Sequence, residues 1–451
     1  MELKCTDTGN ADRFKSHYGD TVKHLEEKGR FIVFDEDGWA EADKFILAKE
    51  VVIEIHQEAA ECKDDSRRIE LGKWAITSES AAKQQDMLKL AASYTNVSVD
   101  KFDANPTVIN CKNGIVNLKT KKFYHHSPEH LHLNKANAEY RPDATCPRWL
   151  RFLDEIFAGN QELINWIQIA AGYSIMGLTR EHCFFLCYGV GRNGKSTFLE
   201  TLQYILGNYA HKTNFETFLQ NERASSVRAM EAVGDLKGKR FVIASEANDG
   251  TRFDAARIKE LTGGDTLSGT VLHRPKFTFV PTHTLWFACN TRPQIKDETI
   301  AMWSRVKTIP FNVIFIDEDQ EAGLSETLRN EADGIFTWLV DGAYLYLKND
   351  ELPESPEVCK QATQEYREMN DELSRFIGEC LVKEPSAKTL VTAVYDSYLS
   401  WHPEYTELIE LKKFGNELAK RGISKKRQNT GMVLVGYRLR LPEDVSVASV
   451  E

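Results

Sequence analysis

The feature that most constrains this chain is a glycine-rich loop between an apolar run and a helical pattern. The stretch YGVGRNGKSTFLETL occupies residues 188–202, and residues 189–196 match G-x-x-x-x-G-K-[ST] at every fixed position. Glycines in such a loop let backbone N–H groups close around phosphate oxygens. A helix beginning at Lys195 points the positive end of its dipole at the same oxygens. We therefore predict a phosphate-binding loop; the alternative is a chance glycine turn.

The pattern assigns a chemical task to each polar side chain of the loop. We expect the Lys195 ammonium to reach the β- and γ-phosphates of ATP, and the Ser196 hydroxyl to bind Mg²⁺. The residues expected to contact the nucleotide are Gly189, Gly191, Asn193, Gly194, Lys195, Ser196 and Thr197. The predicted cofactors are ATP and Mg²⁺.

Polar residues also end two apolar runs downstream of the loop. RFVIASE ends at Glu246, and HTLWFACN ends at Asn290. The carboxyl ends of parallel strands form the edge of the sheet at which ligands bind. We expect Glu246 to orient water or help hold Mg²⁺, and the Asn290 amide to contact the γ-phosphate or the attacking water. The alternative for each is an ordinary polar residue at a strand end.

Arg305 precedes another apolar strand, in DETIAMWSRVKTIPF. An arginine at this point could reach the nucleotide of a neighbouring subunit as an arginine finger. The alternative is a surface salt bridge.

Apolar strands that alternate with helices indicate the fold class. HCFFLCYG, RFVIASE and HTLWFACN predict buried strands, and KSTFLETLQYILG predicts a helix. This order predicts an α/β core with a mostly parallel sheet and helices on its faces. Further expectations are a hairpin turning at Asn113-Gly114, two helices between Arg148 and Gly177, and an amphipathic helix at IFTWLVDGAYLYL.

A chain of 451 residues is longer than one hydrophobic core usually takes. RPDATCP and KNDELPESPE interrupt the periodic pattern and mark boundaries. Helices are expected around residues 360–382 and 388–401, followed by a helix, a turn, a helix and a strand, an order that fits a winged helix. The predicted domains are an α+β domain (1–145), a helical collar or linker (146–180), a P-loop, AAA+-like core (181–350), and a helical and winged-helix-like domain (351–451).

Composition excludes several classes of protein. The net charge of −10 does not suit a protein that coats its whole surface with nucleic acid, so any DNA contact must be local. The nine scattered cysteines form no CxxC pair, which favours reduced, buried thiols over a zinc site. The charged N-terminus has no apolar signal-peptide region, and no run of about 18 apolar residues predicts a membrane span.

The C-terminal segment reverses the overall charge. Between Lys412 and Arg440 there are nine basic residues, and Glu417 is the only acidic one. A helix, a basic turn and a wing with this charge suit phosphate contacts. We expect the turn residues Lys425, Lys426 and Arg427 to bind DNA. The alternatives are a solvated charged face and a wing that docks a protein.

The motifs occur in an order that resembles the superfamily 3 helicase domain of the phage, plasmid and poxvirus primase–helicase family. The segments that carry the resemblance are GxxxxGKS, RFVIASE, KELTGGDTLSG, FVPTHTLWFACNTRP and MWSRVKTIPF. TDTGNADRF and FDANPTVINCKNGIVNL resemble the domain that precedes the helicase, and EADGIFTWLVDGAYLY and YDSYLSW resemble downstream segments. The likeness covers nearly the whole chain.

The resemblance implies an assembly and a substrate. It implies a ring, usually a hexamer, with ATP bound between subunits and 3′→5′ translocation on single-stranded or forked DNA. By position, it makes Asn290 the sensor, Arg305 the finger supplied in trans, and Lys259 a second trans-acting cation. The implied compartment is the cytoplasm of a bacterial host, with a phage or mobile element as the source.

VLHRPKF matches the family's hairpin that projects into the central channel. The resemblance implies that His273, Arg274 and Lys276 contact the DNA backbone, since a cationic hairpin tracks phosphates without recognising sequence. The alternative is a plain exposed hairpin.

The chain departs from the family pattern at three points. The acidic pair of the second motif is Ser245-Glu246 here, so one carboxylate would perform two tasks. Thr270 stands where an arginine is frequent. No primase residues are found upstream, so we expect a separate primase or polymerase, or a part outside this chain, to prime synthesis.

Three functions remain open from the sequence. The first is an ATP-driven DNA helicase or translocase ring. The second is an ATP-gated DNA-binding protein or helicase loader that does not unwind DNA, and the third is a replication initiator that marks an origin. Glu246 and Arg305 favour hydrolysis, because a protein that only switches on ATP binding could lose either residue.

Overall fold

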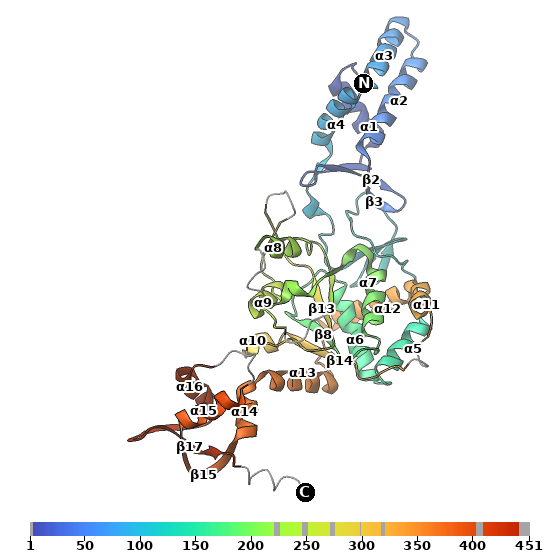
Figure 1. Ribbon diagram of the computed structural model, residues 1–451. Coiled ribbons are helices and arrows are strands. Elements are labelled where there is room, and N and C mark those ends of the chain that lie inside the picture. Colours follow the sequence, from blue (N-terminus) through green and yellow to red (C-terminus); the bar gives the residue numbers. More distant parts are fainter. Residues whose placement is uncertain are drawn as a thin grey trace.

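The computed structural model describes residues 3–220, 226–245, 251–270, 276–297, 299–316, 321–402 and 409–441. Figure 1 shows an elongated molecule in which an N-terminal arm, a central core and a C-terminal module follow one another. Within these residues, no helix combines the length and apolar character needed to cross a bilayer.

The N-terminal arm is an α+β unit, as predicted. Its sheet has the order β3-β2-β1-β4, and Phe14, Val51 and Leu88 pack in the cluster between its helices. Its helices are α1 (Asp7–Tyr18), α2 (Lys44–Glu61), α3 (Asp65–Ser78) and α4 (Ala81–Thr95). Its strands are β1 (Val22–Leu25), β2 (Arg30–Asp35), β3 (Gly38–Glu41) and β4 (Asn96–Val97).

A small antiparallel sheet joins the arm to the core. It consists of β5 (Val108–Cys111), β6 (Gly114–Asn117) and β7 (Lys122–Tyr124). Cys111 pairs with Gly114, so the hairpin turns at Lys112-Asn113, one residue earlier than predicted. Ile109 and Val116 share the largest hydrophobic cluster with the core helices. The boundary predicted at residue 145 therefore falls inside one hydrophobic core.

The centre of the molecule is a five-stranded sheet in which every neighbouring pair is parallel. The order is β14-β8-β13-β10-β9, which confirms the predicted parallel sheet. Its strands are β8 (Phe184–Tyr188), β9 (Ala210–Asn214), β10 (Phe241–Ser245), β13 (Thr284–Cys289) and β14 (Val306–Pro310). The edge strand β9 was not predicted, because its sequence AHKTN is mostly polar.

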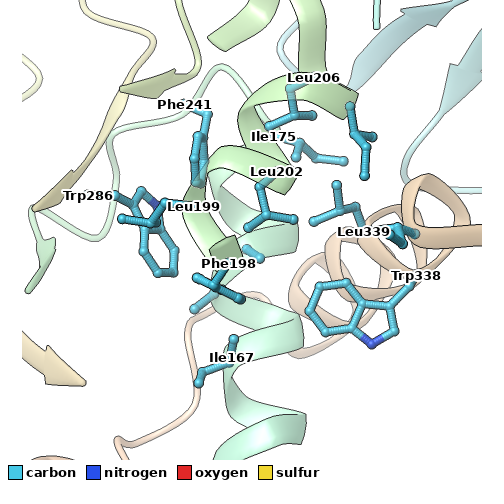
Figure 2. Close-up of a cluster of buried hydrophobic side chains, with 14 of the residues drawn as sticks. Ile167, Ile175, Phe198, Leu199, Leu202, Leu206, Phe241, Trp286, Trp338 and Leu339 are labelled. Carbon is cyan, nitrogen blue, oxygen red and sulfur yellow. The ribbon is translucent and has the colours of Figure 1, made fainter. Parts of the chain in front are cut away.

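Both faces of the sheet are buried, which explains the continuous apolar runs of its strands. Phe185, Phe241 and Trp286 face one cluster, whereas their neighbours Phe184 and Val242 face another. Figure 2 shows the first cluster, in which Leu199 and Leu202 lie between Trp286 and Leu339.

Helices cover the two faces (Figure 1). The first cluster includes residues of α5 (Pro147–Ile156), α6 (Gln161–Ser174), α7 (Lys195–Leu206), α11 (Leu324–Asn330) and α12 (Ala332–Asn349). The two helices predicted in 146–180 are therefore present, but they pack in the core instead of forming a separate linker. The other face carries α8 (Ser226–Gly234), α9 (Ala255–Thr262) and α10 (Ile300–Trp303).

The C-terminal module follows α13 (Glu357–Asn370), which lies between it and the core (Figure 1). It has helices α14 (Glu372–Cys380), α15 (Val391–Trp401) and α16 (Leu411–Lys420). It has strands β15 (Leu381–Leu390), β16 (Lys425–Gln428) and β17 (Gly431–Leu439), paired antiparallel in the order β15-β17-β16.

The structure of this module differs from the prediction at three points. A helix, a turn and a second helix were expected before the last strand, but the described residues after α15 hold one helix, α16, and Lys425, Lys426 and Arg427 lie on strand β16 and not in a turn.

The helix predicted over 360–382 is two helices, because the side chain of Asp371 accepts a hydrogen bond from the Ser374 backbone N–H and so begins α14. The strand β15 was missed, since its proline and its alternating polar residues, LVKEPSAKTL, suggest a loop. Its pairing with β17 shifts register between Lys383 and Lys388, which accommodates the proline.

Candidate nucleotide site and nucleic-acid surfaces

The predicted phosphate loop joins the carboxyl end of β8 to the first turn of α7. Two of its glycines are required by the surroundings. Gly194 has φ 84°, and a Cβ there would lie 2.6 Å from Ile156 Cγ2 on α5. A Cβ on Gly189 would lie 2.3 Å from the Phe311 carbonyl oxygen. Gly191 has open space around its Cα, so packing within the chain does not require a glycine there.

Lys195 is the buried cation of this loop, with 6% of its surface exposed. Its Nζ donates to the Gly189 carbonyl at 2.5 Å, to Asn193 Oδ1 at 3.0 Å and to Asn290 Oδ1 at 3.1 Å. Burial lowers the pKa of this ammonium. Within the described residues no carboxylate forms an ion pair with it. The loop therefore holds a positive charge whose partners are all neutral, which favours the approach of an anion.

Asn193 organises the loop from inside. It is 2% exposed. Its Nδ2 donates to the Phe311 carbonyl at 3.0 Å, and its Oδ1 accepts from the Lys195 ammonium. The Phe315 N–H donates to the Arg192 carbonyl at 2.8 Å. The segment after β14 thus lines the loop, a contact that the sequence analysis missed; the apolar run continuing past Pro310 was its one signal.

Asn290 follows β13 directly and meets the loop at Lys195, so the structure brings these two predicted residues together. Ser196 is exposed in the first turn of α7, and Thr197 beside it is half-buried. The exposed Ser196 hydroxyl is an oxygen donor of the type that Mg²⁺ binds beside a nucleotide.

Glu246 lies outside the described residues, but the strand before it is well placed. Ser245, the last residue of β10, pairs with Ala288, and Ala288 pairs with Cys187. The carboxyl end of β10 therefore lies on the same side of the sheet as the carboxyl end of β8, which leads into the phosphate loop.

Arg305 lies at the amino-terminal ends of the strands, opposite the end that carries the phosphate loop. Its carbonyl accepts from the N–H of Phe184, the first residue of β8, so roughly 17 Å of strand separates it from the loop. Its Nε donates to Thr262 Oγ1 of α9 at 3.2 Å, and its Nη1 donates to the Ala301 carbonyl. Arg305 and the phosphate loop of the same chain therefore do not form one site.

Lys259 lies on α9, one helical turn before Thr262. Its Nζ is 2.5 Å from Asp297 Oδ2 and 3.3 Å from Thr299 Oγ1. Burial acts to raise the pKa of Asp297, but hydrogen bonds from Lys259 and Thr299 outweigh it and lower that pKa. The structure thus places Lys259 with Arg305 around α9. Both were predicted to act in trans, at the nucleotide site of a neighbouring subunit.

The arms of the predicted hairpin are β11 (Leu267–Gly269) and β12 (Phe277–Phe279), which pair antiparallel. Lys276 is exposed just before β12. His273 and Arg274 lie outside the described residues.

The basic segment of the C-terminal module is partly neutralised. Arg421 pairs with Asp371 at 2.8 Å, and Arg438 pairs with Glu384 at 2.6 Å. The count along the sequence missed these acids, because they lie outside residues 412–440. Lys425, Lys426 and Arg427 are exposed on β16, and Lys425 Nζ donates to Asn416 Oδ1 at 2.5 Å. This strand keeps a positive face.

Two segments of the chain match family models, and part of the chain is similar to viral proteins. Residues 11–158 match the family model described as D5 N terminal like, and residues 187–305 match a family of unknown function, DUF5906. "Putative helicase L207/L206" of Acanthamoeba polyphaga mimivirus is 27% identical over 324 residues, which cover 67% of this chain and 33% of that protein. "Putative primase C962R" of an African swine fever virus isolate is 22% identical over 329 residues, which cover 67% and 34%. The chain is therefore similar to viral proteins named putative helicases and primases.

The chain matches only part of each relative. It spans about a third of the length of the curated relatives it matches. "Putative helicase 184R" of Invertebrate iridescent virus 6 is 23% identical over 298 residues, which cover 64% of this chain and 28% of that protein.

Solved structures agree on the fold. A structure titled "The apo structure of NrS-1 C terminal region" has a TM-score of 0.52 at 10% identity and covers 95% of this chain and 99% of that one. A second crystal form of this region has a TM-score of 0.51. The likeness therefore extends over the arm, the core and the C-terminal module.

The two family models cover different parts of the chain. The first ends at residue 158, after α5, and so includes the small sheet β5-β6-β7. The second begins at Cys187, beside the phosphate loop, and ends at Arg305. It contains every predicted nucleotide-site residue.

Proposed function

We propose that the chain is an ATP-driven superfamily 3 DNA helicase or translocase with a P-loop, AAA+-like core. The observation that carries this proposal is the buried Lys195 ammonium, held by the oxygens of Gly189, Asn193 and Asn290 without a carboxylate partner in the described part of the chain. A phosphate would supply the missing negative charge. The helicase-named relatives support the same class of enzyme.

Each predicted residue at the carboxyl ends of the strands has a proposed task. Lys195 binds the β- and γ-phosphates, the backbone N–H groups of residues 189–194 surround them, and Thr197 lies beside them at the start of α7. Ser196 and Glu246 hold Mg²⁺, which neutralises charge that develops on the phosphates. Asn290 contacts the γ-phosphate or the attacking water, and Glu246 orients that water.

The position of Arg305 favours a ring. Because Arg305 lies at the far end of the strands from its own loop, we propose that Arg305 and Lys259 complete the nucleotide site of a neighbouring subunit. The proposed assembly is a closed hexamer in which every interface is the same. An arginine that reaches a transition state from another subunit makes hydrolysis depend on assembly.

Single-stranded or forked DNA is the proposed substrate, with 3′→5′ movement. The hairpin β11–β12, with His273, Arg274 and Lys276, would contact DNA in the channel. For the C-terminal module we propose a winged helix, supported by the order α14-β15-α15-α16-β16-β17, in which Lys425, Lys426 and Arg427 on β16 would bind phosphates. A separate primase or polymerase is the proposed partner.

Substitution of Lys195 tests the nucleotide site. Lys195→Ala is expected to reduce ATP hydrolysis on the order of 100-fold, because it removes the cation that binds the transferred phosphoryl group. Lys212→Ala serves as the control, since Lys212 forms a surface ion pair with Glu200 at 3.6 Å. Normal hydrolysis by the Lys195→Ala variant, measured as phosphate release, would rule out the proposed site.

The second candidate is an ATP-gated DNA-binding initiator or helicase loader. The exposed basic residues of β16 favour this candidate, because an initiator needs a module that binds DNA but does not need to unwind it. Strand displacement on 3′-tailed and 5′-tailed duplexes separates the two: a helicase unwinds one polarity in an ATP-dependent manner, whereas a loader unwinds neither.

A further inference from the structure

Arg292 is a buried cation beside the phosphate loop that the proposed mechanism does not use. Its side chain is 8% exposed. Its guanidinium lies over the ring of Tyr188, with Cζ 3.9 Å from the ring centroid, and 5.6 Å from the ring of Tyr366 on α13. Arg292 therefore lies between a residue of β8 and a residue of α13.

Charge pairing does not explain this position. Among the described residues, the carboxylate that pairs with Arg292 is that of Glu365, which is 3.9 Å away and 68% exposed, so solvent weakens that ion pair. Nη1 contacts Met369 Sδ at 3.6 Å, and Nε has no hydrogen-bond partner among the described residues. The faces of the two tyrosine rings are the principal favourable surroundings of the guanidinium.

The ring beneath Arg292 belongs to the base of the phosphate loop. Tyr188 directly precedes Gly189, whose carbonyl accepts from Lys195, and Asn290, two residues before Arg292, accepts from the same ammonium. The stack of Arg292 on Tyr188 thus joins the two segments that meet at Lys195.

Helix α13 contacts the segment 292–295 from the other side. The Tyr366 hydroxyl donates to the Pro293 carbonyl, and Asn370 Oδ1 accepts from the Ile295 N–H at 2.7 Å. Residues 292–295 are therefore fastened to β8 through a side chain and to α13 through their backbone.

We propose that Arg292 is a positioning residue that keeps Asn290 in register with the phosphate loop. The inference rests on the proposed function, since it assigns Arg292 to the ATPase reaction of that site. Arg292 acts through Asn290, and its contribution depends on the charge that stacks on Tyr188 and not on the volume of the side chain alone.

Three substitutions test this role. Arg292→Met keeps an unbranched side chain of similar length but removes the charge, and Arg292→Lys restores a cation. Arg329→Met is the matched control, because Arg329 also lies over a tyrosine, Tyr204, at 4.7 Å, away from the nucleotide site. For each variant the kcat and KM for ATP, the Tm, and the hydrogen exchange of the peptide spanning 291–297 are measured.

Arg292→Met is expected to lower kcat about tenfold, since a desolvated cation–π contact of this kind is lost. KM and Tm are expected to stay near wild type, exchange of 291–297 to accelerate, and Arg292→Lys to recover most of the kcat. Unchanged exchange in Arg292→Met, or a kcat for Arg292→Lys no better than that for Arg292→Met, would overturn the proposal. A wild-type protein that hydrolyses no ATP would instead overturn the proposed function, and the exchange measurement would still decide whether Arg292 holds the loop.

Discussion

At the scale of single residues, the contact between Lys195 and Asn290 joins the phosphate loop to the residue that follows β13. The Asn290 oxygen lies 3.1 Å from the ammonium, which also donates to the oxygens of Gly189, Val190 and Asn193. This neutral set of acceptors leaves the charge of Lys195 available to an anionic ligand.

Asn290→Asp is expected to weaken ATP binding by about tenfold or more, because a carboxylate beside the Lys195 ammonium neutralises it and repels the phosphates. Asn290→Ala, which adds no charge, is expected to reduce hydrolysis with a smaller effect on binding. A titration with a fluorescent ATP analogue measures the affinities, and Asn349→Asp at the exposed end of α12 is the control. An Asn290→Asp variant that binds ATP as tightly as wild type would contradict this electrostatic account.

At the scale of secondary-structure elements, Asp371 is the junction between α13 and the C-terminal module. Its carboxylate accepts from the Ser374 backbone N–H at 2.9 Å and from Arg421 Nη2 at 2.8 Å. Burial acts to raise the pKa of Asp371, but the hydrogen bonds from Arg421 and Ser374 outweigh it and lower that pKa. The ionised form therefore stabilises the folded module.

Asp371→Asn is expected to destabilise the C-terminal module by about 1–2 kcal/mol at neutral pH, since it weakens a helix cap and a charged hydrogen bond. Because the folded-state pKa is depressed, the contribution is complete above the unfolded pKa of about 4 and is lost as the pH falls through the folded value. Thermal unfolding at several pH values measures this. The difference between wild type and variant should shrink at low pH, and a constant difference would contradict the assignment. Asp396→Asn on the exposed face of α15 is the control.

Elements whose residue pattern is local could be predicted from the sequence, and those that depend on distant contacts could not. The loop around Lys195 and the strands before and after it follow from glycine positions and apolar runs. Strand β9 was missed because it is an edge strand whose residues are mostly polar. Strand β15 was missed because its backbone hydrogen bonds go to β17, which is distant in the sequence. Arg292 was missed for the same reason, because its contact with the Tyr188 ring forms only when the chain folds.

At the scale of the whole molecule, the separation of Arg305 from its own phosphate loop makes a prediction about assembly. Arg305→Ala and Glu246→Gln variants are each expected to lose hydrolysis on the order of 100-fold. Mixed in equal amounts, they are expected to regain activity, because about one interface in four then joins an intact loop and Glu246 to an intact Arg305. Phosphate release from the mixture measures this. Normal hydrolysis by Arg305→Ala alone, or no recovery in assembled mixtures, would contradict the role in trans.

The elongated arrangement places the arm and the C-terminal module at opposite ends of the core (Figure 1). The core then holds the proposed nucleotide site, while the exposed basic residues of β16 lie in the C-terminal module. If the chain is a DNA motor, engagement of DNA must change the rate of the reaction at Lys195.

The most direct measurement is the rate of ATP hydrolysis with and without single-stranded DNA, with Lys195→Ala as the control. A DNA-driven motor predicts that DNA stimulates hydrolysis by wild type and leaves the variant inactive. ATP binding without hydrolysis under either condition would contradict the motor and favour the ATP-gated loader.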